Sequence, residues 1–89
     1  SGNSLGANLP TVKIKSKDLN KQIGIIDLII LSKLENSKSE IRRLLKGNAI
    51  KINDKLVEDE KMIIDDKLFN KNYLKLSIGK KRHIKIELT

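Results

Sequence analysis

The sequence has no cysteine and no tryptophan, and only one proline, one tyrosine and one phenylalanine. Without cysteine, the chain forms neither a disulfide framework nor a thiolate metal site, and such usage fits a cytosolic protein. Aromatic residues make up 2% of the chain. They provide no platform for stacking splayed bases, so sequence-specific readout of single-stranded RNA is not predicted.

Long apolar runs and negative charge are also scarce. No stretch approaches the roughly 20 apolar residues of a membrane-spanning helix, and the N-terminus lacks the basic-then-apolar pattern of a secretory signal. We therefore predict a cytoplasmic protein without a membrane segment. The chain has 19 basic and 11 acidic residues, giving a net charge of +8, and its pI is about 9.8. This excess predicts a polyanionic partner, with nucleic acid favoured over an anionic membrane.

Chain length predicts one small domain with a single core, because half of 89 residues would bury too little apolar surface. Residues 1–8 are mainly Gly, Ser and Asn and are interpreted as a flexible leader or linker, with the domain at 9–89. The chain does not begin with Met, which suggests a piece of a longer protein. An expression scar at Ser1 and Gly2 would look the same.

The segment after Ser37 has the pattern of a capped basic helix. The Ser37 hydroxyl can accept from an amide three residues on while Glu40 reaches back, a reciprocal capping box that predicts a helix start at Lys38. At about 100° per residue, one face of this helix is cationic and the other is apolar. The cationic residues are Lys38, Arg42, Arg43 and Lys46, and the apolar ones are Ile41, Leu44 and Leu45.

Strand patterns follow this helix and close the chain. Gly47 is predicted to be a left-handed C-cap, and the alternation at 50–52 predicts a strand that turns at 53–54 and returns over 55–57. A second hairpin is predicted from 73–78 and 84–88. With a short strand at 12–14 and a buried helix at 25–34, the chain reads as an α+β fold: two short helices on a small, mainly antiparallel sheet.

Cations recur at the tips of both predicted hairpins, and together with the helix face they form the candidate RNA-binding set. Paired arginines strengthen this prediction because guanidinium groups make bidentate contacts with phosphates. The residues are Lys38, Arg42, Arg43, Lys46, Lys51, Lys55, Lys80, Lys81 and Arg82. Residues 56–69 hold two lysines and five carboxylates, a net charge of −3, so this acidic segment is expected to lie away from the RNA surface.

Catalytic chemistry is not predicted for this chain. It has no glycine-rich phosphate loop, no nucleophile with a positioned base and no cluster of metal ligands. Adjacent carboxylates at Asp65 and Asp66 are usually just solvated. His83, the only histidine, is interpreted as a surface or phosphate-contact residue.

The sequence Ser-Lys-Ser-Glu-Ile-Arg-Arg-Leu-Leu, followed by Gly47 and Ala-Ile-Lys-Ile-Asn, resembles the ribosomal protein S-four-type RNA-binding domain, or alpha-L motif. Relatives often carry a second Gly where this chain has Asn48. Across 9–89, the order of elements resembles the C-terminal domain of bacterial-type tyrosyl-tRNA synthetases.

That resemblance implies a domain that grips the variable arm and anticodon side of tRNA-Tyr. The catalytic signatures of the synthetase family are absent, so this fragment is expected to be monomeric, inactive alone and free of cofactors. A parent tyrosine–tRNA ligase would be a homodimer using ATP and magnesium. The alternatives are an S-four-like domain of an rRNA-binding protein or pseudouridine synthase, a helix-turn-helix DNA-binding module, and a protein-interaction module with an acidic partner.

Overall fold

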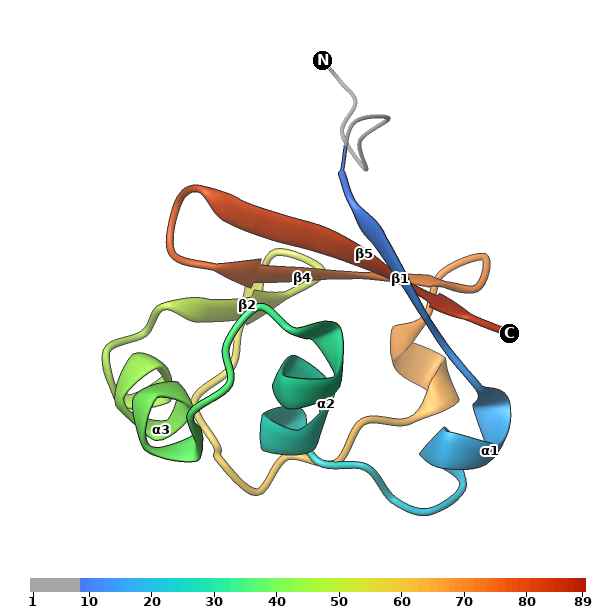
Figure 1. Ribbon diagram of the computed structural model, residues 1–89, viewed down its shortest axis with the longest axis horizontal. Coiled ribbons are helices and arrows are strands. Elements are labelled where there is room, and N and C mark those ends of the chain that lie inside the picture. The colour runs from blue at the N-terminus through green and yellow to red at the C-terminus, as the bar shows by residue number, and fades with distance from the viewer. Residues whose placement is uncertain (1–8) are drawn as a thin grey trace.

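A computed structural model describes residues 9–89 as a five-stranded sheet with all helices on one face (Figure 1). The leader predicted at 1–8 lies outside the described residues. The elements, in chain order, are β1 (Thr11–Ile14), α1 (Ser16–Leu19), α2 (Ile25–Ser32), α3 (Lys38–Lys46), β2 (Ile50–Ile52), β3 (Lys55–Leu56), the 3-10 turn η1 (Asp66–Leu68), β4 (Tyr73–Ile78) and β5 (Arg82–Leu88).

The sheet has the strand order β1-β5-β4-β2-β3. Three of its pairs are antiparallel, and β1 pairs with β5 in parallel. Both predicted hairpins are confirmed: β2 turns into β3 at Asn53 and Asp54, which have φ of 52° and 68°, and β4 pairs with β5 from Tyr73 to Ile78. The α+β class is therefore confirmed, with a mixed sheet.

Two helices were predicted, but residues 9–89 contain three, because α1 was missed. This helix has only four residues and no apolar periodicity. Its first residue, Ser16, donates from both its amide and its hydroxyl to the carbonyl of Thr89. That partner is 73 residues away, so local sequence carries no signal of it.

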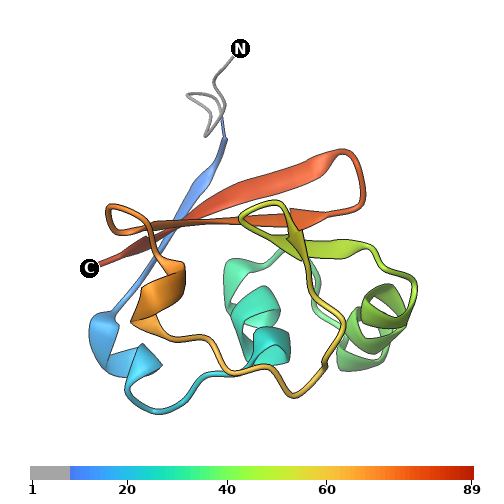
Figure 2. The same cartoon turned by 180° about the vertical axis from the view of Figure 1, so that it is seen from behind.

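The core lies between one face of the sheet and the helices. Alternate residues of β2, β4 and β5 point into it, as period-two alternation predicts. The predicted helix at 25–34 ends earlier, at Ser32, because Lys33 adopts φ 65° and closes the helix. No helix of residues 9–89 lies on the opposite face of the sheet, as the two opposed views show (Figures 1 and 2). No helix among residues 9–89 is long and apolar enough to cross a membrane.

Candidate nucleic-acid interface

Helix α3 begins at Lys38, as predicted, and half of the expected capping box forms. The Ser37 hydroxyl accepts from the Glu40 amide at 3.2 Å. The reciprocal bond was wrongly predicted: the Glu40 carboxylate pairs with Arg43, one turn further along the same helix. The Ser37 amide instead donates to a Glu35 carboxylate oxygen at 3.4 Å. A nearby guanidinium is a better partner for a carboxylate than a neutral amide is.

The C-terminus of α3 differs from the prediction in one residue. Gly47 has φ −87°, so it is not a left-handed cap. The left-handed residue is Asn48, with φ 60°, and asparagine is among the few residues that tolerate this conformation. The Ala49 amide then donates to the Leu44 carbonyl at 3.0 Å. The chain thus turns from α3 into β2 within three residues.

Two hydrogen bonds join the turn between β4 and β5 to the region of α3. The Gly79 amide donates to the carbonyl of Ala49 at 2.7 Å, directly beyond the helix end. The Arg82 guanidinium donates to the Leu34 carbonyl at 3.2 Å, in the connection from α2 to α3. Both views place this turn and α3 at the same end of the molecule, opposite α1 (Figures 1 and 2).

Seven of the nine candidate cations therefore lie at one end of the molecule, and all seven are exposed. We call this set the basic edge. Its members are Lys38, Arg42, Arg43, Lys46, Lys80, Lys81 and Arg82. The other two candidates do not join it. Lys51 alternates with the buried Ile50 and Ile52 and so lies on the helix-free face of the sheet, and Lys55 follows the β2–β3 turn at the far end of β2.

His83 fixes the turn that presents Lys80 and Lys81. Its Nε2 atom lies 2.8 Å from the Lys80 carbonyl oxygen, and its Nδ1 atom lies 2.8 Å from the hydroxyl oxygen of the buried Ser77. Because a carbonyl oxygen only accepts, Nε2 carries a hydrogen. The interpretation of His83 as a surface residue missed this bracing. The available signal was Ser77, a small polar residue in the predicted strand 73–78, which pairs with His83 in the observed register.

The acidic segment was expected to lie away from the RNA surface, but one of its carboxylates contacts a candidate residue of that surface. The Glu60 carboxylate is 3.4 Å from the Arg42 guanidinium, and both side chains are about half exposed. The segment is held against the body of the domain because Val57 and Ile64 are buried in the core and Met62 packs against it. Composition alone showed the charge of this segment but not the surface against which it packs.

Known proteins match the chain along nearly all of its length. The family model described as the tyrosine–tRNA ligase SYY-like C-terminal domain matches residues 3–86. The chain belongs to this family. It is 61% identical over 88 residues to a tyrosine–tRNA ligase of Pelagibacter ubique, covering 99% of the chain and 22% of that protein. It is 50% identical over 82 residues to the tyrosine–tRNA ligase of Rickettsia massiliae, covering 91% of the chain and 20% of that protein. It is 38% identical over 85 residues to the tyrosine–tRNA ligase of Bartonella quintana, covering 94% of the chain and 20% of that protein.

These comparisons confirm the predicted membership of the tyrosyl-tRNA synthetase C-terminal family. The SYY-like domain spans about a fifth of the length of these relatives. Within residues 9–89, it holds no group of three or more His, Asp or Glu side chains that could bind a metal ion. The basic edge offers exposed guanidinium and ammonium groups, which bind carboxylates and phosphates.

Proposed function

We propose that this chain is the tRNA-binding C-terminal domain of a tyrosine–tRNA ligase, in which the basic edge contacts the phosphate backbone of folded tRNA-Tyr. The observation that carries the proposal is the bond from Gly79 to Ala49. This bond ties the β4–β5 turn to the connection that follows α3, so that the lysines of the turn and the arginines of α3 lie at the same end of the molecule. We also assign the fold to the S-four-like, alpha-L group.

The contacts are expected to be made with phosphates and RNA shape rather than with bases. The chain has one phenylalanine, one tyrosine and no tryptophan, and aromatic side chains are the usual platforms for base stacking. The domain would then supply affinity and register on the variable arm and anticodon side of the tRNA. Aminoacylation, with ATP and magnesium, would belong to parts of a homodimeric parent enzyme that this chain does not contain.

Salt titration tests the electrostatic part of this proposal. If about six cations contact phosphates, the logarithm of tRNA affinity falls with the logarithm of salt concentration at a slope of roughly 4 to 5. Fluorescence anisotropy with labelled tRNA-Tyr measures this slope. A slope near zero would contradict phosphate binding, and equal competition by duplex DNA would favour a helix-turn-helix DNA-binding module instead.

Two arginine variants test whether the exposed face of α3 contributes to tRNA binding. Arg42→Ala and Arg43→Ala are each expected to weaken tRNA binding several-fold while the circular-dichroism spectrum stays unchanged. Both side chains lie on the polar face of α3, with 51% and 77% of their surface exposed. Loss of the helical signal in either variant would assign it a structural role. Lys17→Gln, on α1 at the other end of the molecule, is the charge-matched control.

A further inference from the structure

The connection between α2 and α3 is held by the side chain of Glu35. One carboxylate oxygen, Oε1, accepts from the backbone amides of Asn36 and Ser37 at 2.9 and 3.4 Å. The other oxygen, Oε2, lies 4.0 Å from the guanidinium of Arg82. The same guanidinium donates to the Leu34 carbonyl at 3.2 Å. Glu35 and Arg82 therefore link the start of α3 to the start of β5.

The Glu35 side chain is 24% exposed, which makes it the least exposed of the four carboxylates that form ion pairs within residues 9–89. Glu60, the other carboxylate that pairs across elements with a cation of α3, is 45% exposed and has one partner, Arg42. A carboxylate that loses contact with water needs polar partners in exchange, and Glu35 has two amides and a guanidinium. Glu35 is thus built into the chain at the basic edge, whereas Glu60 lies on its surface.

Arg82 is also one of two links between the β4–β5 turn and α3. The Gly79 amide bonds to Ala49, just beyond the C-terminal end of α3. Arg82 bonds to Leu34, in the connection before the N-terminal end of the helix. The turn is therefore joined to the chain beyond both ends of α3, and the two lysines of the turn lie between these two links in the sequence.

We propose that Glu35 is a positioning residue of the basic edge. Acting through Arg82 and through the amides at the start of α3, it sets where Lys80 and Lys81 lie relative to the helix. It thereby strengthens tRNA binding although it carries the same sign of charge as the RNA. Arg82 then serves as the link to the turn rather than as a phosphate contact. This inference rests on the proposed function and deepens it.

Glu35→Gln tests the proposal by the sign of its effect. The substitution keeps the shape of the side chain and removes its charge. If charge alone matters, removing an anion beside the RNA raises tRNA affinity. If Glu35 positions the cations, we expect affinity to fall about fivefold, because the guanidinium loses its charged partner. Fluorescence anisotropy with labelled tRNA-Tyr measures the change, and a gain or an unchanged affinity would overturn the proposal.

Glu60→Gln is the matched control for this sign. It makes the same change at a carboxylate of the same region, but one that pairs with Arg42 and makes no bond to the backbone within residues 9–89. We expect its tRNA affinity to rise. A fall in both variants would show that any loss of a carboxylate here weakens binding, and would contradict a specific role of Glu35.

A double-mutant cycle separates positioning from a general loss of stability. In the background of Lys80→Gln with Lys81→Gln, Glu35→Gln should cause no further loss of tRNA affinity, because the side chains that it positions are absent. A fold that is merely weakened would lower affinity by the same factor in both backgrounds, and this result would overturn the positioning role. Circular dichroism checks that each variant is folded during the titration.

Arg82→Gln provides a second variant on the same link. It should lower tRNA affinity as much as Glu35→Gln does, and the two substitutions together should cause no greater loss than either alone. Additive losses would show that Arg82 contacts the RNA itself, which would contradict its assignment as the link between Glu35 and the turn.

Backbone amide NMR signals test the link in the absence of RNA. Glu35→Gln should shift the signals of Lys80 and Lys81, and Glu60→Gln should leave them in place. If both lysine signals stay in place in Glu35→Gln, the proposal is overturned even where tRNA affinity changes. If the unsubstituted chain does not bind tRNA-Tyr, the proposed function is overturned instead, and shifted lysine signals would still establish the link.

Discussion

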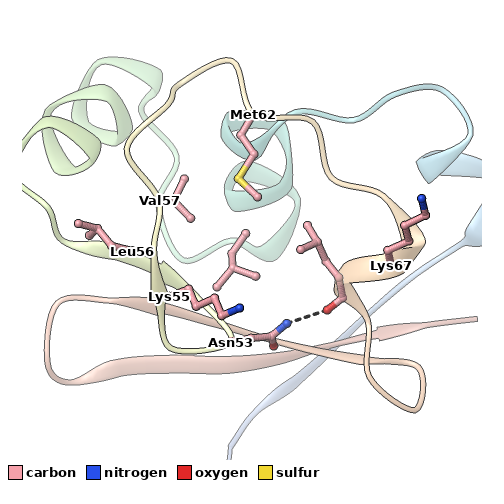
Figure 3. Close-up of a pocket in the computed structure, with 8 residues that line it drawn as sticks. Asn53, Lys55, Leu56, Val57, Met62 and Lys67 are labelled. Atoms are coloured by element: carbon pink, nitrogen blue, oxygen red, sulfur yellow. Dashed lines mark hydrogen bonds between the residues drawn. The ribbon is translucent and has the colours of Figure 1, made fainter.

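The two hairpins resemble each other in pairing and in charge but differ in how their tips are held. The β2–β3 tip is tied to the body mainly by side chains. The Asn53 side-chain amide bonds to Leu68 (Figure 3) and to Lys75, and Asp54 lies 3.0 Å from the Lys75 ammonium, in addition to one backbone bond from the Asn53 amide to the Lys75 carbonyl. The β4–β5 tip is tied by its backbone carbonyl and amide groups, which bond to His83 and to the α3–β2 connection.

This difference separates residues that hold the chain together from residues of the proposed interface. At the first tip, polar side chains are engaged in holding the chain together. At the second, Lys80 and Lys81 form no ion pair among residues 9–89 and extend into solvent. We therefore expect substitutions at the first tip to change mainly stability, and lysine substitutions at the second to change mainly tRNA binding.

The largest expected effect is that of Asn53→Ala. It removes two hydrogen bonds, each worth about 1 kcal/mol, and places alanine at a positive φ, for a total loss of about 2 to 3 kcal/mol in the free energy of unfolding. Asn72→Ala is the control, because Asn72 also has positive φ, of 72°, but makes no side-chain hydrogen bond within the described residues. Urea unfolding measures the free energy of unfolding of both variants. Equal losses would show that backbone strain at positive φ, and not the two hydrogen bonds, accounts for the effect of Asn53→Ala.

The second largest expected effect is a loss of tRNA binding in the double variant Lys80→Gln with Lys81→Gln. Losing two phosphate contacts should lower the salt slope by about 1.5 and tRNA affinity by about tenfold at low salt. The midpoint of unfolding should not change. The control is Lys17→Gln with Lys21→Gln, which removes the same charge near α1. If both double variants lose affinity equally, net charge rather than the basic edge is responsible.

Gly79→Ala has a smaller expected effect on stability. Gly79 adopts φ 67°, and a Cβ atom there would meet no other atom within 4 Å, so the cost is conformational and amounts to about 1 kcal/mol. Gly79→Asn should recover most of that loss, because asparagine already occupies the left-handed region at Asn48 and Asn53 in this chain. Thermal unfolding compares the variants. An equal loss of stability in the alanine and asparagine variants would show that a side-chain contact, rather than backbone strain at positive φ, causes the loss.

How far the sequence predicts this fold depends on the range of the interactions. The hairpins and the start of α3 follow from turn residues and one capping serine, all local signals. The meeting of the β4–β5 turn with α3 depends on a bond between Gly79 and Ala49, thirty residues apart, and the bracing by His83 depends on strand register. Sequence patterns identified the cations, but these long-range bonds decide which of them lie together.

The pairing of Glu60 with Arg42 was the least predictable contact, and we expect its removal to have the smallest effect on tRNA binding. If Arg42 contacts a phosphate, the Glu60 carboxylate, which lies 3.4 Å from its Nε atom, competes for the guanidinium. Exposed ion pairs are worth at most about 1 kcal/mol, so Glu60→Gln should raise tRNA affinity about two- to fivefold. Glu58→Gln removes the same charge from an exposed residue with no ion pair in the described chain, and should raise affinity less. In an Arg42→Ala background the gain from Glu60→Gln should disappear, because the carboxylate then has no guanidinium to withhold. A gain that persists in that background would show that Glu60 repels the RNA directly instead of competing with it for Arg42.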